Sequence, residues 1–126
     1  MTQTVLVVED EVLVRLDIVD YLSDCGYCVL EATDASDAVT QICARSDIDV
    51  IFSDVRMPGP LDGVALARWV IETRPEIAVI LTSGHFAQEA TLRGIYGTPL
   101  FSKPYERAAV HIKIQELLRR PPSESA

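Results

Sequence analysis

Five short runs of apolar residues, rich in β-branched side chains, recur along the chain and predict strands. The runs are Val5–Val8, Cys28–Leu30, Val50–Phe52, Ile77–Leu81 and the less apolar Thr98–Phe101. A run that is apolar throughout, rather than at alternate positions, is typical of a strand covered on both faces. Pro99 cannot donate a hydrogen bond to a neighbouring strand, so the fifth strand is expected to lie at a sheet edge or to begin there.

The segments that follow these runs space their apolar residues three or four apart, which predicts helices. The expected helices are Glu11–Ser23, Asp34–Arg45, Leu61–Thr73, Gly84–Arg93 and Tyr105–Arg120. In the first helix, Val12, Leu16 and Val19 share one face. Asp34 is expected to cap the second helix, because an aspartate side chain can accept hydrogen bonds from the free N–H groups of the first turn.

The regular alternation of strand and helix predicts one α/β domain over residues 1–120, followed by a short polar tail at residues 121–126. Strands buried on both faces require helices on both sides, which gives a doubly wound, five-stranded parallel sheet. Right-handed crossover connections leave few topologies, and five strands favour the order 2-1-3-4-5.

Composition and charge narrow the classes of function. The 126 residues are 48% hydrophobic and 24% charged, which is average for a globular domain. The formal net charge of −8 disfavours direct binding to nucleic acids or to anionic membranes. No apolar stretch is long enough for a signal-peptide core or a membrane span. Since three cysteines cannot all pair within one chain, a reducing, cytoplasmic location is expected.

Charged and hydroxyl side chains stand at the ends of four expected strands. They are Glu9–Asp10 after the first strand, Asp54 after the third, Thr82–Ser83 after the fourth and Lys103 after the fifth. The carboxyl ends of parallel strands meet at one edge of the sheet, and sites form where the strand order reverses. We therefore expect these groups to converge, although each residue alone is also typical of a helix cap, a turn or a solvated surface.

Such a set predicts a site for a divalent cation and a phosphoryl group. Neighbouring carboxylates repel one another, and a set of hard oxygen ligands suits Mg²⁺. A lysine supplies a positive charge for phosphoryl oxygens, and a threonine hydroxyl can donate a hydrogen bond to them. A carboxylate without a neighbouring general base suits a nucleophile that forms an aspartyl phosphate.

Four stretches together resemble the motifs of response-regulator receiver domains, which belong to two-component signalling. The stretches are Val5–Glu11 (VLVVEDE), Ser53–Pro58 (SDVRMP) with Asp62–Gly63, Leu81–Gly84 (LTSG) and Ser102–Tyr105 (SKPY). The resemblance extends from Val5 to about Arg119. It implies the flavodoxin-like receiver fold, Mg²⁺ as cofactor, and phosphorylation by a sensor histidine kinase.

The resemblance also implies a role for each site residue. Asp54 would be the phospho-acceptor and would bind Mg²⁺ together with Asp10. The backbone carbonyl of Arg56 would be a third protein ligand, and Glu9 would act through water.

Two further residues would contact the phosphoryl group. Lys103 would pair with its oxygens, and Thr82 would move to bond one of them. The peptide bond between Lys103 and Pro104 is expected to be cis.

The chain departs from the usual receiver pattern at two places. Leu100 stands where receivers carry an aromatic residue, and the loop Met57–Gly63 is one residue longer than the common one. Since nothing follows the last expected helix, the resemblance implies a stand-alone receiver without an output domain, similar to those paired with HWE-family histidine kinases.

Such a receiver would bind a downstream regulatory protein when phosphorylated, or would drain phosphate from a shared kinase. A homodimer through the face of the fourth helix, fifth strand and fifth helix is a further expectation.

Three other functions stay open. An aspartyl phosphatase would need a second acid two residues after its nucleophile, where Arg56 stands. A flavin carrier would need a phosphate-binding loop after the first strand, where Glu9–Asp10–Glu11 would repel phosphate. A constitutive adaptor that is never phosphorylated would explain Leu100 but not the intact Asp54 and Lys103. We expect a signalling module rather than an enzyme that turns over an external substrate.

Overall fold

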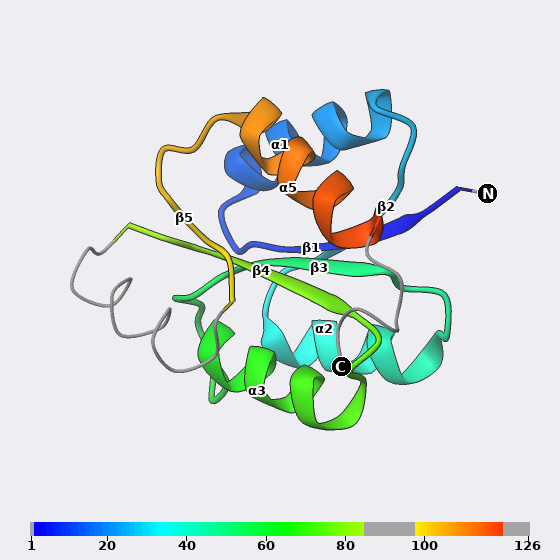
Figure 1. Ribbon diagram of the computed structural model, residues 1–126. Coiled ribbons are helices and arrows are strands. Elements are labelled where there is room, and N and C mark those ends of the chain that lie inside the picture. The colour runs from blue at the N-terminus through cyan, green and yellow to red at the C-terminus, as the bar shows by residue number, and fades with distance from the viewer. Residues whose placement is uncertain (1, 85–97, 120–126) are drawn as a thin grey trace.

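A computed structural model describes residues 2–84 and 98–119 of the protein and shows a three-layered α/β domain (Figure 1). The five strands are β1 (Thr4–Val8), β2 (Cys28–Ala32), β3 (Val50–Asp54), β4 (Ala78–Ser83) and β5 (Leu100–Ser102). All neighbouring strands pair in parallel, in the order β2-β1-β3-β4-β5. The predicted fold class and strand order are therefore confirmed.

Four helices cover the two faces of this sheet. They are α1 (Val12–Asp24), α2 (Ala35–Ala44), α3 (Gly63–Thr73) and α5 (Arg107–Arg119). In Figure 1, α1 and α5 lie on one side of the sheet, and α2 and α3 lie on the other. The helix expected at Gly84–Arg93 and the tail at 121–126 lie outside the described residues, except for Gly84 itself.

Strands β1 and β3 are buried on both faces because each face supports its own core, whereas the edge strand β2, expected to be buried on both faces, is only partly buried. Leu6, Val8 and Ile51 pack towards α2 and α3. Val5, Val7 and Phe52, the intervening residues, pack with α1 and α5. This two-residue alternation follows from the pleat of a strand, and it explains the uninterrupted apolar runs in the sequence.

Side-chain caps set the start of two helices. The Asp34 carboxylate accepts a hydrogen bond of 2.8 Å from the Asp37 backbone N–H, which confirms the predicted cap of α2. Asp62 accepts one of 2.9 Å from the Ala65 N–H, so α3 begins at Gly63 and not at Leu61 as expected. The loop before α3 is consequently longer than the sequence pattern indicated.

The buried side of α1 differs from the face picked out by the spacing of Val12, Leu16 and Val19. Ile18 and Leu22 are fully buried, whereas Val12 and Leu16 are exposed and Val19 is only partly buried. Apolar residues occur all around this helix, so their spacing does not select one face. Burial is decided by how α1 lies against the sheet and α5.

Candidate functional site

An acidic pocket lies at the carboxyl ends of β1 and β3, two neighbouring inner strands of the sheet. Glu9 and Asp10 directly follow β1, and Asp54 is the last residue of β3. Carboxylate oxygens from these three residues all lie within 4.8 Å of one another. Glu9 is only 4% exposed and Asp54 only 8%, whereas Asp10 is open to solvent. The structure thus brings together three carboxylates from two segments far apart in the sequence.

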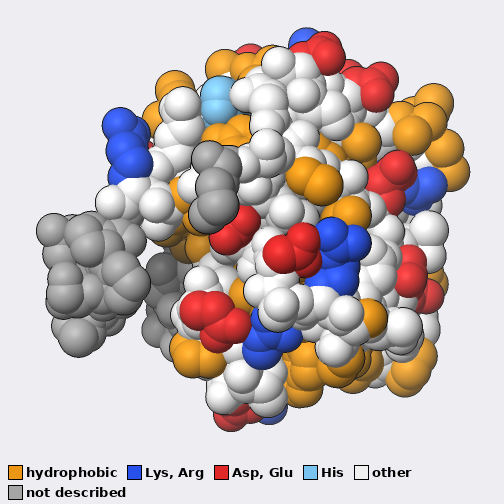
Figure 2. Space-filling view, turned by 90° about the vertical axis from the view of Figure 1, so that its right-hand side faces the viewer, with side chains coloured by type: hydrophobic (Ala, Val, Ile, Leu, Met, Phe, Trp, Pro, Cys, Tyr) orange, Lys and Arg blue, Asp and Glu red, His pale blue; other side chains and the backbone are white. Residues whose placement is uncertain are grey.

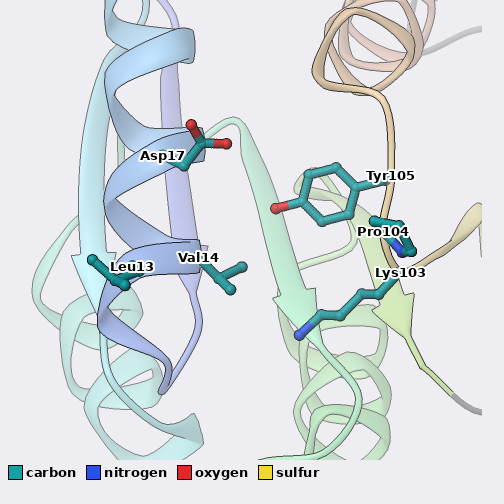
Figure 3. Close-up of a pocket in the computed structure, with 6 residues that line it drawn as sticks. All are labelled: Leu13, Val14, Asp17, Lys103, Pro104 and Tyr105. Atoms are coloured by element: carbon teal, nitrogen blue, oxygen red, sulfur yellow. The ribbon is translucent and has the colours of Figure 1, made fainter.

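Lys103, which directly follows the edge strand β5, closes this pocket. Its ammonium nitrogen, Nζ, lies 2.8 Å from Glu9 Oε1 and 2.9 Å from Asp54 Oδ2. The Lys103 backbone N–H donates to the Ser83 carbonyl at 3.0 Å, which fixes the segment after β5 to the end of β4. The peptide bond to Pro104 is cis, as expected. Figure 3 shows the Lys103 side chain extended from this segment towards the strand ends.

Two backbone N–H groups orient the buried carboxylates. The N–H of Glu11 donates to Glu9 Oε2 at 3.1 Å, and the N–H of Arg56 donates to Asp54 Oδ1 at 3.3 Å. Each carboxylate therefore has one oxygen held by the backbone and the other held by Lys103. Such fixed carboxylates bind a small cation with little loss of side-chain freedom.

Burial and charge shift the ionisation of the pocket residues. Burial raises the pKa of Glu9, and the nearby Asp54 carboxylate adds to this effect, while the hydrogen bond from Lys103 opposes it. Burial by itself lowers the pKa of Lys103, but hydrogen bonds to Asp54 and Glu9 outweigh it and hold the pKa above its usual value. Lys103 is therefore a permanent cation at physiological pH.

The donor set of the pocket fits a divalent cation. With all three carboxylates ionised and Lys103 protonated, the pocket carries a net charge of minus two. Its side-chain donors are all oxygens, and hard oxygen donors suit Mg²⁺. The accessible Asp10 lets an ion approach without opening the buried part of the pocket. These residues are able to bind a metal, and the chemistry of the set favours Mg²⁺.

Thr82 lies beside Asp54 on the neighbouring strand. The two residues are register partners in β4 and β3. Thr82 is buried, and its carbonyl accepts a hydrogen bond of 2.9 Å from the Val55 N–H. The structure thus places Thr82 at the same sheet edge as the acidic pocket.

A groove that the sequence did not predict runs beside Lys103 (Figure 3). It has a volume of about 490 Å³ and lies between α1 and the segment after β5. Leu13 and Val14 form one wall, and Pro104 and Tyr105 form the other. The Tyr105 ring packs edge-on against Phe52, with ring centroids 5.4 Å apart. Burial, followed by the negative charge of Glu9, raises the pKa of the Tyr105 hydroxyl to about 12.

The opposite end of the molecule has a different character. Figure 2 shows the face at the amino ends of the strands, where acidic, basic and apolar side chains are interspersed. The loops before β3 and β4 carry local ion pairs, Arg45–Asp47 at 2.8 Å and Arg74–Glu76 at 2.7 Å. Both pairs lie at the opposite end of the strands from the acidic pocket, so substitutions there leave the pocket residues in place.

Two contacts of the site escaped sequence reasoning. Arg15 donates a hydrogen bond of 2.9 Å to the backbone carbonyl of Glu9, a contact between side chain and main chain that leaves no pattern in the sequence. Gly63 lies so close to Asp54 that a Cβ atom there would overlap the Asp54 backbone oxygen. A glycine directly after a helix-capping aspartate was the available signal for this second contact.

No helix within residues 2–84 and 98–119 is both long enough and apolar enough to cross a membrane. This agrees with the sequence, in which every apolar run is short.

Comparison with known proteins identifies the domain. The response regulator receiver domain model matches residues 5–115. The chain is 34% identical over 122 residues to the sensor kinase CckA of Brucella abortus (strain 2308), covering 93% of this chain and 13% of that protein. It is 30% identical over 121 residues to the aerobic respiration control protein ArcA of Escherichia coli (strain K12), covering 94% and 50%. The chain spans half or less of these two relatives.

Solved structures of receivers superpose closely on this one. A response regulator receiver protein from Sinorhizobium medicae WSM419 gives a TM-score of 0.84 at 28% identity, covering 93% of this chain and 94% of that one. The receiver domain of NtrX from Brucella abortus gives 0.82 at 32% identity, covering 93% and 99%. Sequence match, strand order and acidic pocket agree, and the chain belongs to the response regulator receiver domain family.

Proposed function

We propose that this receiver accepts a phosphoryl group on Asp54 from a histidine of a sensor kinase, in a reaction that depends on Mg²⁺. The observation that carries the proposal is the setting of the Asp54 carboxylate. One oxygen lies 2.9 Å from the Lys103 ammonium, and two further carboxylates lie within 4.8 Å. A nucleophile held between a cation and a metal-binding set suits phosphoryl transfer.

The transfer is a displacement at phosphorus. An Asp54 oxygen forms a bond to phosphorus while the bond from phosphorus to the histidine nitrogen breaks, and that nitrogen retains the electron pair. Lys103 supplies positive charge for the phosphoryl oxygens, and Thr82 supplies a hydroxyl at the next strand. The Arg56 N–H keeps the Asp54 carboxylate oriented during the attack.

The metal ligands in this proposal are Asp10, Asp54 and the backbone carbonyl of Arg56, with Glu9 acting through water. Bound Mg²⁺ offsets the repulsion between the carboxylates and the incoming phosphoryl group. Glu9 suits an indirect role because Lys103 already occupies its Oε1 at 2.8 Å. Asp10 suits a direct one because it is the accessible carboxylate of the three.

The donor protein is a histidine kinase, because receiver domains pair with histidine kinases. Its phosphohistidine must reach Asp54 past the rim of the pocket, where α1 exposes Val12, Leu13 and Leu16. Leu13 is 82% exposed and lines the groove next to Lys103. We place the kinase-contact surface on these three side chains and Pro104. Pairing with an HWE-family kinase in particular stays a prediction.

The output is carried by protein binding, either to a downstream regulatory protein or, for a phosphate sink, to the kinase alone.

Leu100 is buried and packs in the core layer of α2 and α3. A buried leucine thus stands where the family resemblance leads one to expect an aromatic residue. Dimerisation through the face of the expected fourth helix, β5 and α5 stays a prediction, since residues 85–97 lie outside the described residues.

An aspartyl phosphatase is the less favoured candidate. Position 56, two residues after Asp54, carries an arginine, and its described backbone contact is donation to the Asp54 carboxylate. Within residues 2–84 and 98–119, the other carboxylates of the pocket are Glu9 and Asp10. The second acid that such a phosphatase needs two residues after its nucleophile is replaced by Arg56.

Intact-mass measurement after incubation with phosphoramidate, with and without Mg²⁺, tests the proposal. The wild-type chain is expected to gain one phosphoryl group only with Mg²⁺, and Asp54→Asn to gain none. Asp47→Asn, an aspartate at the opposite end of the strands, is the matched control and is expected to behave as wild type. Phosphoryl incorporation into Asp54→Asn would place the acceptor elsewhere.

A further inference from the structure

Arg15 connects helix α1 to the backbone of the acidic pocket. Its side chain is only 13% exposed. Nη1 donates a hydrogen bond of 2.9 Å to the Glu9 carbonyl oxygen, and Nε donates one of 3.0 Å to Glu31 Oε1. The guanidinium thus bridges the segment after β1 and the neighbouring strand β2.

The Glu9 carbonyl belongs to the peptide unit that joins Glu9 to Asp10. The N–H of Glu9 is already held by the Ala32 carbonyl at 3.0 Å. With Arg15 on the carbonyl, the main chain of Glu9 is fixed on both sides. The peptide plane between the Cα atoms of Glu9 and Asp10 is thereby held in one orientation, and these Cα atoms carry the two acidic side chains.

No helical hydrogen bond replaces this contact. Helix α1 begins at Val12, and the Arg15 N–H donates to the Glu11 carbonyl at 2.9 Å. The Glu9 carbonyl precedes the helix and has no donor in the first turn. Without the guanidinium it would be satisfied by water, which does not define a direction.

We propose that Arg15 is a positioning residue that orients Glu9 and Asp10 for metal binding, and that Glu31 anchors it. The proposal rests on the magnesium site proposed above. It adds a residue that contacts neither the ion nor the phosphoryl group.

The charge of Arg15 makes this role separable from simple electrostatics. A cation beside the pocket repels a metal ion, so a purely electrostatic Arg15 would weaken binding, and its neutralisation would strengthen it. A positioning Arg15 would instead strengthen metal binding, and its loss would weaken binding because the peptide unit is freed. Arg15→Lys keeps the charge and removes the two-armed bridge, so only the positioning role predicts weaker binding for it.

Anchoring by Glu31 follows from its own contacts. Glu31 pairs with Val7 in the sheet, and its carbonyl accepts a hydrogen bond of 2.6 Å from the Gln41 side-chain amide. Its side chain is 41% exposed, so the ion pair with Arg15 adds little to stability by itself. Glu31 is therefore expected to affect the pocket only by holding the Arg15 guanidinium in place.

Binding of Mn²⁺ by the full chain, followed by electron paramagnetic resonance, is the main test. Arg15→Lys is expected to raise the Kd for Mn²⁺ about tenfold, the lower end of what indirect supports of metal ligands contribute. Arg45→Lys, in an ion pair at the opposite end of the strands, is the matched control and is expected to keep the wild-type Kd. An unchanged or lower Kd in Arg15→Lys would overturn the proposal.

A second measurement uses the metal-free protein. Hydrogen exchange at the Glu9 amide, measured with a chelator present, is expected to be faster in Arg15→Lys, while the thermal midpoint stays close to wild type. Equal exchange in both proteins would also contradict the positioning role.

A double-mutant cycle tests the anchor. Glu31→Ala is expected to raise the Kd in the wild-type background and to have a smaller effect in Arg15→Lys, because both changes act on one contact. Fully additive effects would remove Glu31 from the proposal. Absence of Mn²⁺ binding by the wild-type chain would refute the proposed function, whereas equal binding by wild type and Arg15→Lys refutes this inference alone.

Discussion

The ammonium of Lys103 pairs with two almost fully buried carboxylates. It is therefore expected to contribute more to the stability of the fold than a single ion pair does. Nζ lies within 2.9 Å of an oxygen from both Glu9 and Asp54. Lys113, the other lysine of the chain, pairs with Glu116 at 3.1 Å, but both side chains are exposed. Exposed pairs contribute little because water and salt screen them, whereas a buried carboxylate without a partner is costly.

Lys103→Met is therefore expected to lower the free energy of unfolding of the metal-free protein at pH 7 by about 1–3 kcal/mol. The loss arises because two buried carboxylates are left facing each other. Urea unfolding measures it, with Lys113→Met as the matched control, for which we expect a change below about 0.5 kcal/mol. Equal losses in the two variants would contradict the role given to Lys103 in the pocket.

Glu9 gives a pH-dependent prediction. Burial raises its pKa above the ordinary value of 4.5, so the folded state holds the proton more tightly than the unfolded chain does. The carboxylate therefore destabilises the fold increasingly as pH rises from 4.5 through the raised pKa, and the full cost is present above that pKa.

Glu9→Gln removes this cost and is expected to stabilise the metal-free protein at pH 7 by about 1 kcal/mol. The gain should shrink towards zero at pH 4, where the wild-type carboxyl is protonated, and metal binding should weaken. Urea unfolding at both pH values checks this. Glu76→Gln, at an exposed glutamate whose pKa is lowered by its hydrogen bond to Arg74, is expected to show no gain. A gain for Glu9→Gln that is independent of pH would show that the carboxylate charge is not its cause.

Among single residues, those at strand ends were predictable and those acting on the backbone were not. Asp10, Asp54 and Lys103 were found because parallel strands carry their carboxyl ends to one edge, which sequence order alone specifies. Arg15 was missed because its partner is a carbonyl, and every residue has one. A contact of that kind becomes visible only when helix α1 is placed in space.

At the scale of elements, the start of α3 lies directly against the end of β3. The Gly63 N–H donates to the Val55 carbonyl at 2.8 Å. No Cβ fits at Gly63 without displacing the Asp54 backbone oxygen. This close approach couples the first turn of α3 to the position of Asp54.

Gly63→Ala is expected to destabilise the protein by about 1–3 kcal/mol, because the added methyl group forces helix and strand apart. Metal affinity should fall as well, since Asp54 moves with its backbone. Thermal unfolding and Mn²⁺ titration measure the two effects. Gly84→Ala, where a Cβ meets no atom of residues 2–84 and 98–119 within 4 Å, is the control and should be close to neutral. Neutral behaviour of Gly63→Ala would show that the contact relaxes freely.

Helix α1 was predicted as an element, but its buried side was not. Strands β1, β3 and β4 each contain an uninterrupted apolar run because both their faces are covered, so their pattern is unambiguous. In α1, apolar residues occupy several faces, and only contact with the sheet and α5 buries Ile18 and Leu22. Val12, Leu13 and Leu16 stay exposed, and Leu13 lines the groove.

Leu13→Ser tests whether these exposed side chains contact the kinase. We expect the KM for phosphotransfer from the kinase to rise several-fold, while stability changes by less than about 0.5 kcal/mol, as for other exposed positions. Ile112→Ser on α5 is the matched control, since Ile112 is also an exposed aliphatic residue. Equal KM values for the two variants would exclude Leu13 from the contact surface.

Across the whole molecule, negative charge is in excess, and three carboxylates gather at the carboxyl ends of β1 and β3. The chain carries a net charge of −8, and the acidic pocket carries minus two of it in a partly buried setting. A bound divalent cation neutralises that pocket and interacts with the folded state alone. Metal binding and folding are therefore linked.

Mg²⁺ is accordingly expected to raise the free energy of unfolding, by about 2.7 kcal/mol at a concentration one hundred times its Kd. Calorimetry with Mg²⁺ and with NaCl at equal ionic strength separates binding from screening. Asp54→Asn should show a smaller rise, because it removes one ligand. The same rise in NaCl as in Mg²⁺ would show that no specific ion is bound.

The hydrogen bond between Glu9 and Lys103 joins residues that are 94 positions apart. It links the segment after the first strand to the segment after the last, so Lys103 reaches the pocket only when β5 has paired with β4. A chain in which β5 has not yet paired therefore holds the three carboxylates without the ammonium that neutralises two of them. The phosphoryl transfer proposed for Asp54 accordingly depends on the last strand of the sheet being in place.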